Sequence, residues 1–287
     1  MFCEFNQNIF LSLISHEHIK TVEIWRKTEV NILKKLYKGA FIMKFIGNIC
    51  YGKSKHPEQY LDVYLPDADS FKVFVYMHGG GIEDGDKSNA KTVGEYVASQ
   101  GIAFVSINYR MYPQAMYPQF ICDSAEAVAW VYKNIGEYGK CEGIYIGGSS
   151  AGGYLSMMLC FDNKYLAPYK IPEGVIKGYI HDAGQPTTHF NVLRERGIDS
   201  RRVIIDEAAP IYHIGKADNY PPMMFVVSDN DMKNRYEQTQ LTISTLKHFE
   251  YDESKIYYRM MNGTHCHYSH KEEFGKIICE FIKETEK

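Results

Sequence analysis

The chain has 287 residues, of which 45% are hydrophobic and 23% charged, and its formal net charge at pH 7 is −3. Such a length and composition are typical of a globular protein with one large domain or two small ones. The chain lacks the basic surplus that a nucleic-acid partner would require, so no such partner is expected.

The cysteines and the apolar segments exclude several further classes of protein. The seven cysteines are scattered, odd in number and contain no C-x-x-C pair, which argues against a disulfide framework and against a zinc site. No run of about 18 apolar residues is present, so no membrane span is expected. The apolar stretch at 9–14 lacks both preceding basic residues and a following cleavage site, which makes a poor signal peptide. The expected location is therefore cytoplasmic.

Residues 1–45 are predicted to form a helical extension that precedes the main domain. Apolar residues recur there at roughly helical spacing between positions 19 and 36, among Lys and Glu. Such an amphipathic face could cover a hydrophobic edge of the core or act as a cap over an active-site mouth, and the pattern fits both roles. The main domain is predicted at 46–287.

From position 59 onward, predicted strands alternate with predicted helices. The strands are expected at 61–65, 71–77, 102–107, 144–146, 175–180, 223–227 and 255–260. The helices are expected at 88–100, 120–135, 154–159, 189–196, 235–249 and 272–283. This alternation predicts an α/β fold with a mostly parallel sheet that is covered by helices on both faces.

The strongest local pattern lies at 144–153, where an apolar run stops at a cluster of glycine and serine. A strand that turns abruptly into a helix crowds the backbone at the corner, so the residues two places to either side must lack side chains. Gly148 and Gly152 meet that requirement around Ser150 and complete a G-x-S-x-G pattern. The pattern predicts Ser150 as a nucleophile, with the Ala151 amide facing an oxyanion. A flexible turn would give the same short pattern.

A second glycine-rich segment follows the predicted strand at 71–77 and reads His78-Gly79-Gly80-Gly81. Consecutive glycines let backbone amides approach a ligand without obstruction by side chains. An oxyanion hole built from the loop after an early strand has this requirement. The alternative, a glycine-rich surface loop, would not need the preceding buried strand.

Together the segments 78–81, 108–113 and 148–153 resemble the α/β-hydrolase superfamily. More narrowly, they resemble its hormone-sensitive-lipase-like carboxylesterase branch and the related bacterial carbohydrate and feruloyl esterases. The resemblance covers about residues 58 to 285 and implies an α/β-hydrolase fold with a catalytic domain at 46–287. It also implies that the amides of Gly80, Gly81 and Ala151 form the oxyanion hole.

The same resemblance implies that His78 braces the glycine loop. Two positions depart from the family pattern. Ile82 stands where an aromatic residue usually follows the glycines, and Ser149 stands where an acidic residue commonly precedes the nucleophile.

In this fold a nucleophilic serine is followed along the chain by an acid and then by a histidine. The predicted strand at 223–227 runs into Asp229 and Asp231, and the family spacing between strand and acid favours Asp231. Asp229 would then be a turn or helix-capping residue.

The histidine is expected after the last predicted strand, where His265 and His267 both occur. The family pattern has a loop glycine, a short spacer, the histidine and then an aromatic residue one place further on. Gly263 precedes His265 closely, whereas His267 lies directly before Tyr268, so His265 is the expected base and His267 the alternative. A Cys-His nucleophile or a metal site through Cys266 lacks paired ligand spacing elsewhere in the chain.

Two acidic positions have expected structural roles. Asp123 lies where the family opens a helix with an acid, and it is interpreted as structural. Asp182 ends the strand after the nucleophile helix and could line the pocket or stabilise the loop.

The sequence therefore predicts a serine hydrolase that cleaves small carboxylic esters, with acetyl or similar acyl groups, without a metal or cofactor. An amidase or aryl formamidase that uses the same three residues is the nearest alternative enzyme. A non-catalytic small-ligand-binding member of the fold is the alternative of another class. The expected partner is a small ester, and a monomer and a homo-oligomer are both compatible with the sequence.

Overall fold

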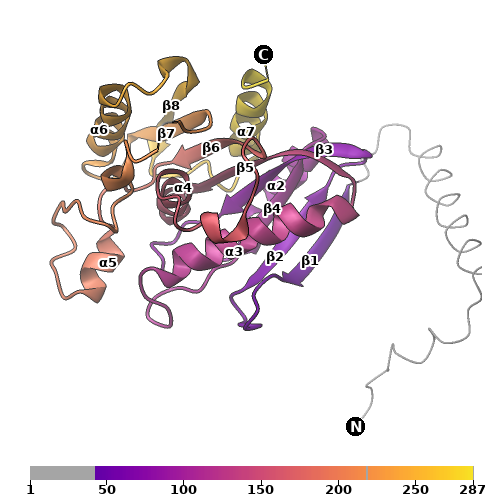
Figure 1. Ribbon diagram of the computed structural model, residues 1–287, viewed down its shortest axis with the longest axis horizontal. Coiled ribbons are helices and arrows are strands. Elements are labelled where there is room, and N and C mark those ends of the chain that lie inside the picture. Colours follow the sequence, from indigo (N-terminus) through magenta and orange to yellow (C-terminus); the bar gives the residue numbers. More distant parts are fainter. Residues whose placement is uncertain (1–42, 218, 287) are drawn as a thin grey trace, which may run out of the picture. The chain divides into compact units, whose positions relative to one another are not determined.

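A computed structural model describes residues 43–217 and 219–286, and residues 43–287 form one compact unit. The helices predicted between 19 and 36 lie outside the described residues. The described part contains an eight-stranded sheet with the order β1-β2-β4-β3-β5-β6-β7-β8 (Figure 1). Its strands are β1 Lys44–Cys50, β2 Tyr60–Leu65, β3 Ser70–Met77, β4 Ala103–Ile107, β5 Lys140–Ser149, β6 Ile176–Asp182, β7 Met223–Asn230 and β8 Ile256–Thr264.

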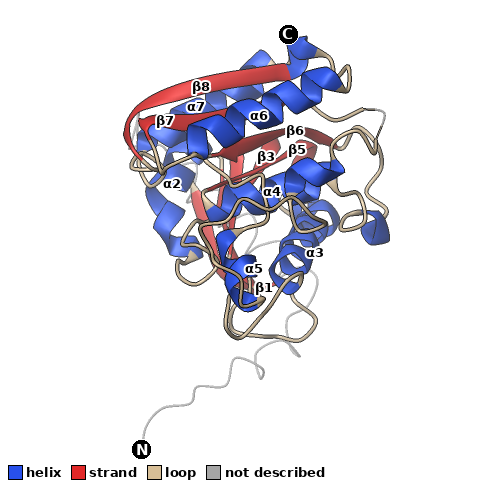
Figure 2. Cartoon of the chain, turned by 90° about the vertical axis from the view of Figure 1, so that its left-hand side faces the viewer, coloured by secondary structure: helices blue, strands red, loops and turns tan. Residues whose placement is uncertain are grey.

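Strand pairing is parallel from β4 to β8 across the sheet, while β2 is antiparallel to both β1 and β4. The main helices are α2 Lys91–Ser99, α3 Gln119–Asn134, α4 Ala151–Phe161, α5 Phe190–Glu195, α6 Arg235–His248 and α7 Glu272–Glu284. Helices α2 and α7 cover one face of the sheet, and α3, α4 and α6 pack with the core on the other face (Figures 1 and 2). The predicted fold class is thereby confirmed.

The two faces of the sheet bury alternate residues of the same strand. In β3, Val73, Val75 and Met77 belong to the core beneath α3 and α4, whereas Phe74 and Tyr76 belong to the core beneath α2 and α7. Because side chains along a strand alternate between faces, a strand covered on both sides reads as a continuous apolar run. This is the pattern from which the central strands are predicted.

Strand β1 is the one strand of the described sheet that the sequence pattern does not predict. It lies at the sheet edge, contains Gly47 and Asn48, and its register shifts between Ile46 and Ile49. Asn48 adopts a φ of 58°, which breaks the regular alternation of the strand. An irregular edge strand therefore carries little periodic signal. It begins at Lys44, just before the predicted start of the main domain, and that boundary stays a prediction.

The carboxyl ends of the parallel strands meet at one edge of the sheet, where ligand sites of open α/β sheets form. This edge brings together His78 after β3, Ser150 after β5, Asp182 at the end of β6, Asp231 after β7 and His265 after β8. Within the described residues, no helix combines the length and apolar character needed to cross a membrane.

Candidate active site

Ser150 lies at the sharp turn between β5 and α4, with a φ of 56° and a ψ of −113°. A positive φ is costly for a residue with a side chain, so the surrounding contacts must hold it in place. The Ser150 amide donates to the carbonyl of Asp182 at 2.7 Å, and its carbonyl accepts from the Tyr154 amide at 3.0 Å. Strand β6 and helix α4 thus fix the backbone of Ser150 on both sides.

The glycines around Ser150 leave no room for a Cβ atom. An added Cβ at Gly148 would lie 2.5 Å from the carbonyl carbon of Gly152, and one at Gly152 would lie 1.9 Å from the carbonyl oxygen of Met77. Both obstacles are backbone atoms, which cannot rotate away. The G-x-S-x-G pattern is therefore a packing requirement of the turn between β5 and α4.

Replacing Gly152 by Ala is expected to destabilise the protein by about 3 kcal/mol or more, because the new methyl group meets backbone that must shift. Gly136→Ala is the matched control, since an added Cβ at Gly136 has no atom within 4 Å. Chemical denaturation of both variants measures the effect. A Gly152→Ala protein as stable as Gly136→Ala would contradict the tight packing of the turn.

The side chains of Ser150, His265 and Asp231 form a continuous hydrogen-bonded chain. His265 Nε2 lies 2.8 Å from Ser150 Oγ, and His265 Nδ1 lies 2.5 Å from Asp231 Oδ1. The Asp231 carboxylate also accepts the amides of Ser228 at 3.1 Å and Met232 at 2.7 Å. Burial raises the pKa of Asp231, but the hydrogen bond from His265 and the other donors outweigh burial, so this pKa lies below its ordinary value.

The alternative acid and base point elsewhere. Asp229 is exposed and accepts the Gly263 amide at 2.7 Å, which ties the end of β7 to the end of β8. His267 places Nδ1 3.0 Å from the carbonyl of Thr264. The structure thus brings Asp231 and His265 to Ser150, and leaves Asp229 and His267 in contacts within the adjoining loops.

The glycine loop after β3 lies beside Ser150. Gly80 and Gly81 have φ angles of 106° and 66°, which favour glycine at both positions. The amides of Gly80, Gly81 and Ala151 donate none of the loop and turn hydrogen bonds in the described part of the chain. Gly80, Ser150 and His265 line a common hollow of about 290 Å³. The Gly80 amide is consequently available to a bound group in the hollow.

His78 lies buried beneath the glycine loop. Its ring stacks on Tyr109 with 4.5 Å between centroids, and its Nδ1 lies 2.7 Å from the carbonyl of Gly79. Tyr109 donates its hydroxyl to the carbonyl of His78 at 2.8 Å. Burial lowers the pKa of His78, which favours the neutral ring. This position is compatible with the expected bracing role, which stays a prediction.

Asp123, interpreted from the sequence as structural, forms a two-pronged ion pair with Arg110. Arg110 Nε lies 2.8 Å from Asp123 Oδ2, and Nη2 lies 2.7 Å from Oδ1. Gln59 also donates to this carboxylate at 2.8 Å. The pair connects the segment after β4 to helix α3 and confirms the structural role.

Asp182 is buried beneath Ser150 and does not line the hollow. Tyr268 donates its hydroxyl to Asp182 Oδ1 at 2.6 Å. Burial raises the pKa of Asp182 to about 6, against the opposing effect of its hydrogen bonds. The sequence left its role open between pocket lining and loop stabilisation. The observed burial favours the second.

Asp182→Asn is expected to change how stability depends on pH. The pKa of Asp182 lies near 6 in the folded protein, against an ordinary value of 3.8. A raised carboxyl pKa contributes stability at low pH that is lost as pH rises through the folded value. Asn cannot ionise, so the variant does not lose this stability. The unfolding free energy of the variant minus that of the unmodified protein should therefore increase by about 2 kcal/mol from pH 4 to pH 7. Urea denaturation across this range measures it, and a constant difference would contradict it.

Cys266 lies beside the imidazole of His265, with Sγ 3.8 Å from Nε2. Burial raises the pKa of its thiol well above the ordinary value, so the thiol stays neutral. A neutral thiol is a poor nucleophile, which leaves Ser150 as the better candidate. The described residues contain no group of three or more His, Cys, Asp or Glu side chains arranged to hold a metal ion.

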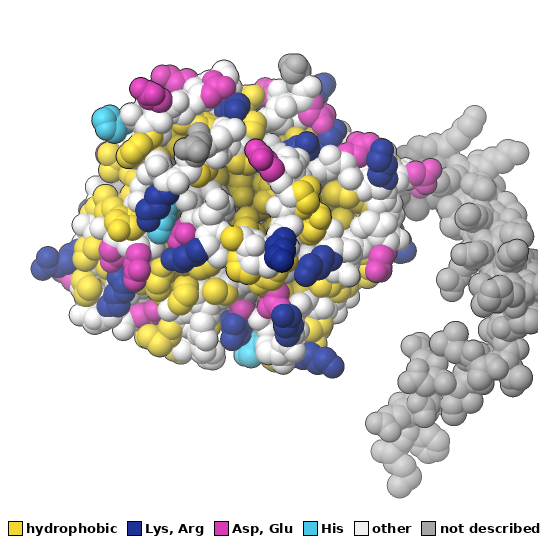
Figure 3. Space-filling view, viewed as in Figure 1, with side chains coloured by type: hydrophobic (Ala, Val, Ile, Leu, Met, Phe, Trp, Pro, Cys, Tyr) yellow, Lys and Arg dark blue, Asp and Glu magenta, His cyan; other side chains and the backbone are white. Residues whose placement is uncertain are grey.

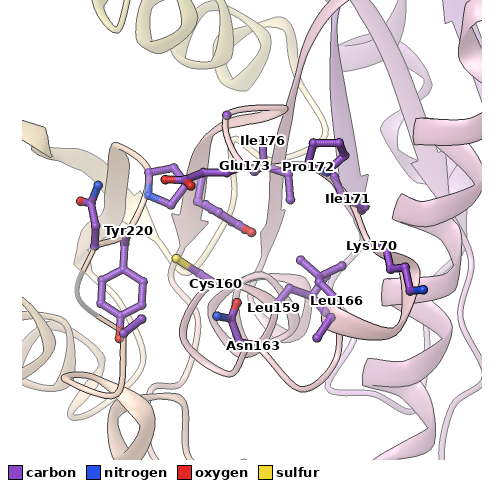
Figure 4. Close-up of a pocket in the computed structure, with 16 residues that line it drawn as sticks. Leu159, Cys160, Asn163, Leu166, Lys170, Ile171, Pro172, Glu173, Ile176 and Tyr220 are labelled. Carbon is purple, nitrogen blue, oxygen red and sulfur yellow. The ribbon is translucent and has the colours of Figure 1, made fainter.

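Another hollow, of about 300 Å³, lies between the end of α4 and the start of β6, at the opposite end of the sheet from Ser150. Its walls include Leu159, Cys160, Leu166, Ile176 and Tyr220 (Figure 4). Burial raises the pKa of the Cys160 thiol well above its ordinary value, which leaves that thiol unreactive.

Comparisons with known proteins agree with this architecture. The BD-FAE family model matches residues 61–192. Esterase B of Lactobacillus rhamnosis has a solved structure that superposes with a TM-score of 0.70 at 17% identity, covering 95% of this chain and 97% of that one. A truncated carbohydrate esterase from gut microbiota gives a TM-score of 0.69 at 18% identity, covering 86% of this chain and 98% of that one. The chain has the α/β-hydrolase fold.

Sequence relatives of this chain carry the names of esterases. Esterase LipC of Mycobacterium tuberculosis is 27% identical over 69% of this chain and 54% of its own length. The probable carboxylic ester hydrolase LipM of the same organism is 37% identical over 38% of this chain and 26% of its own length. The chain thus spans about half or less of the length of these relatives. The resemblance to the carboxylesterase branch is confirmed.

Proposed function

We propose that this α/β-hydrolase is a serine carboxylesterase that cleaves short-acyl esters through Ser150, His265 and Asp231. The observation that carries the proposal is the uninterrupted hydrogen-bond chain from Ser150 Oγ through His265 to Asp231, with distances of 2.8 and 2.5 Å. A serine hydroxyl is a weak nucleophile until a base accepts its proton, and the base needs an orienting acid. Ser150 and His265 line one hollow, and Asp231 is bound to the other ring nitrogen of His265, which supports the proposal.

In the proposed acylation step, Ser150 Oγ attacks the ester carbonyl carbon while His265 Nε2 takes its proton. The negative charge that develops on the carbonyl oxygen is stabilised by the amides of Gly80, Gly81 and Ala151. Asp231 holds His265 in the tautomer with the proton on Nδ1 and stabilises the imidazolium. His265 then protonates the leaving alcohol, the carbon–oxygen bond breaks, and an acyl-Ser150 ester remains.

In the proposed deacylation step, water takes the position of the alcohol. His265 accepts a water proton as the oxygen attacks the acyl carbon, and the same amides stabilise the second oxyanion. Collapse breaks the bond to Ser150 Oγ, which recovers its proton from His265, and the carboxylic acid leaves. The small size of the hollow around Ser150, about 290 Å³, supports a preference for esters of acetyl or similar acyl groups over esters of long acyl chains.

The test is hydrolysis of p-nitrophenyl esters from acetate to long acyl chains, with Ser150→Ala as the control and an aryl formamide series in parallel. Rapid turnover of short esters, lost in the control, is the expected result. Turnover of the formamides alone would replace the esterase proposal with an amidase. If neither series is turned over, labelling by a fluorophosphonate separates a working serine hydrolase with another substrate from a binding protein, which stays unlabelled.

A further inference from the structure

A cavity of about 620 Å³ lies beside the candidate active site and has no part in the mechanism above. It is bounded by the end of β6 and the start of α5, by the segment 200–203, and by the start of α6. Phe190, Val203 and Met232 give it apolar walls, whereas Arg201, Arg202, Lys233 and Arg235 give it four cationic groups. No acidic side chain lines it.

Arg235, the first residue of α6, is buried, with 5% of its surface exposed. Its Nε and Nη1 atoms are inaccessible to solvent and make no hydrogen bond to any described residue. The nearby Asp231 forms neither a hydrogen bond nor an ion pair with it, and that carboxylate accepts from His265, Ser228 and Met232. A guanidinium that is removed from water without a partner is costly, and proteins normally pair such groups.

The other cationic groups of the cavity are also little compensated. Arg201 is paired with the exposed Asp199, at 2.6 Å. Arg202, Lys233 and Arg235 form no ion pair with a described residue. This concentration of positive charge contrasts with the net charge of −3 and with the face in Figure 3, where both signs of charge are intermixed. A cavity of this kind attracts an anion.

Two residues that line the cavity lie next to the loops of the candidate active site. Phe190 lies against the glycine loop, because a Cβ at Gly81 would be 2.9 Å from its ring. Met232 follows Asp231 and donates its amide to that carboxylate at 2.7 Å. Asp231 and Cys266 also act electrostatically on Arg235, which places its charge near the catalytic loops.

We propose that this cavity is a substrate subsite that binds an anionic group of the ester, with the Arg235 guanidinium as its main partner and Lys233 and Arg202 at its rim. The preferred substrates are then esters with a carboxylate on the acid or the alcohol portion, joined to the ester carbonyl by a short apolar segment that lies along Phe190 and Met232. This specificity rests on the proposed esterase function. Hydrogen bonds between a carboxylate and a guanidinium are charge-assisted, and a neutral group cannot replace them.

Two matched pairs of esters test the proposal. The first pair tests a carboxylate on the acid portion of the ester, and the second tests a carboxylate on the alcohol portion. Mono(p-nitrophenyl) glutarate is compared with its neutral methyl ester, and 4-acetoxybenzoate with its neutral methyl ester. We expect kcat/KM to be at least about 10-fold higher for the anionic member of one pair than for its neutral partner. This preference should fall as KCl is added, because salt screens the charges. Arg235→Gln should lower that anionic-to-neutral ratio about 10- to 100-fold.

Arg259→Gln is the control and should keep the original ratio, because Arg259 lies on β8 outside the cavity and is paired with Glu280 of α7. Taking the ratio cancels any general loss of active protein. If Arg235→Gln does not fold, Lys233→Gln should still lower the ratio by a smaller factor. Neutral esters that are preferred or equal in both pairs would overturn the subsite while leaving the esterase function intact.

If no ester is hydrolysed at all, the proposed function fails and the subsite is judged by binding. Calorimetry should then give a millimolar dissociation constant for glutarate, weakened at least about 10-fold in Arg235→Gln and unchanged in Arg259→Gln. Equal binding by both variants, or the absence of binding, would overturn the subsite.

Discussion

Replacing Ser150 by Ala is expected to lower kcat for p-nitrophenyl acetate by about 10⁴- to 10⁶-fold while leaving the thermal unfolding midpoint nearly unchanged. The Ser150 hydroxyl is bonded only to His265 among the described side chains, so its loss removes little packing. The fold of the turn depends on backbone contacts, which Ala retains. Steady-state kinetics together with a thermal melt measure the two effects.

Ser149→Ala is the matched control for this variant, because it changes the adjacent serine of the same turn. Ser149 is buried and accepts the Tyr76 hydroxyl at 3.1 Å, without contact to His265. Fluorophosphonate labelling should persist in Ser149→Ala and disappear in Ser150→Ala. Turnover retained by Ser150→Ala, or labelling lost only in Ser149→Ala, would refute the assignment of Ser150 as the nucleophile.

His265→Ala is expected to lower kcat by about 10⁴-fold or more, whereas His267→Ala should stay within about 3-fold of the unmodified protein. Only His265 touches both Ser150 and Asp231, and His267 contacts the carbonyl of Thr264. The two histidines are two positions apart on one loop, so each variant serves as the control of the other.

Kinetics with p-nitrophenyl acetate measure both variants, and circular dichroism verifies that each is folded. An inactive His267→Ala beside an active His265→Ala would reverse the assignment of the base. If both lose activity to the same extent, the loop would act as a unit and its geometry would matter more than either ring.

The sequence predicts most of the fold because buried parallel strands and the helices between them carry strong periodic signals. The run Val73–Met77 alternates between two cores and is apolar at every position, which a strand covered on both faces requires. Strand β1 is not predicted from the sequence, because its pairing with β2 is interrupted at Gly47 and Asn48 and the alternating pattern of a regular strand is lost there. Nothing local marks such an edge strand, since its position is set by its partner.

The candidate site shows the same division between local and long-range information. Ser150 is predictable because its turn imposes glycine two places away on either side. The resemblance to a family supplies Asp231 and His265, which no local rule separates from Asp229 and His267. The choice between the two expected roles of Asp182, and the burial of Arg235, could not be predicted. Each depends on burial and on unsatisfied polar atoms, which arise only when distant segments pack together.

The hydrogen-bond chain of the candidate site joins segments that are far apart along the polypeptide. Ser150 and His265 are separated by 115 positions, and the residues matched by the family model end at 192, before both Asp231 and His265. Strands β7 and β8, which end next to the proposed acid and base, form one side of the sheet beyond β6. In the proposed mechanism, turnover therefore requires β7 and β8 to be paired with the rest of the sheet. Partial opening of that edge on heating would stop the reaction before the sheet centre melts.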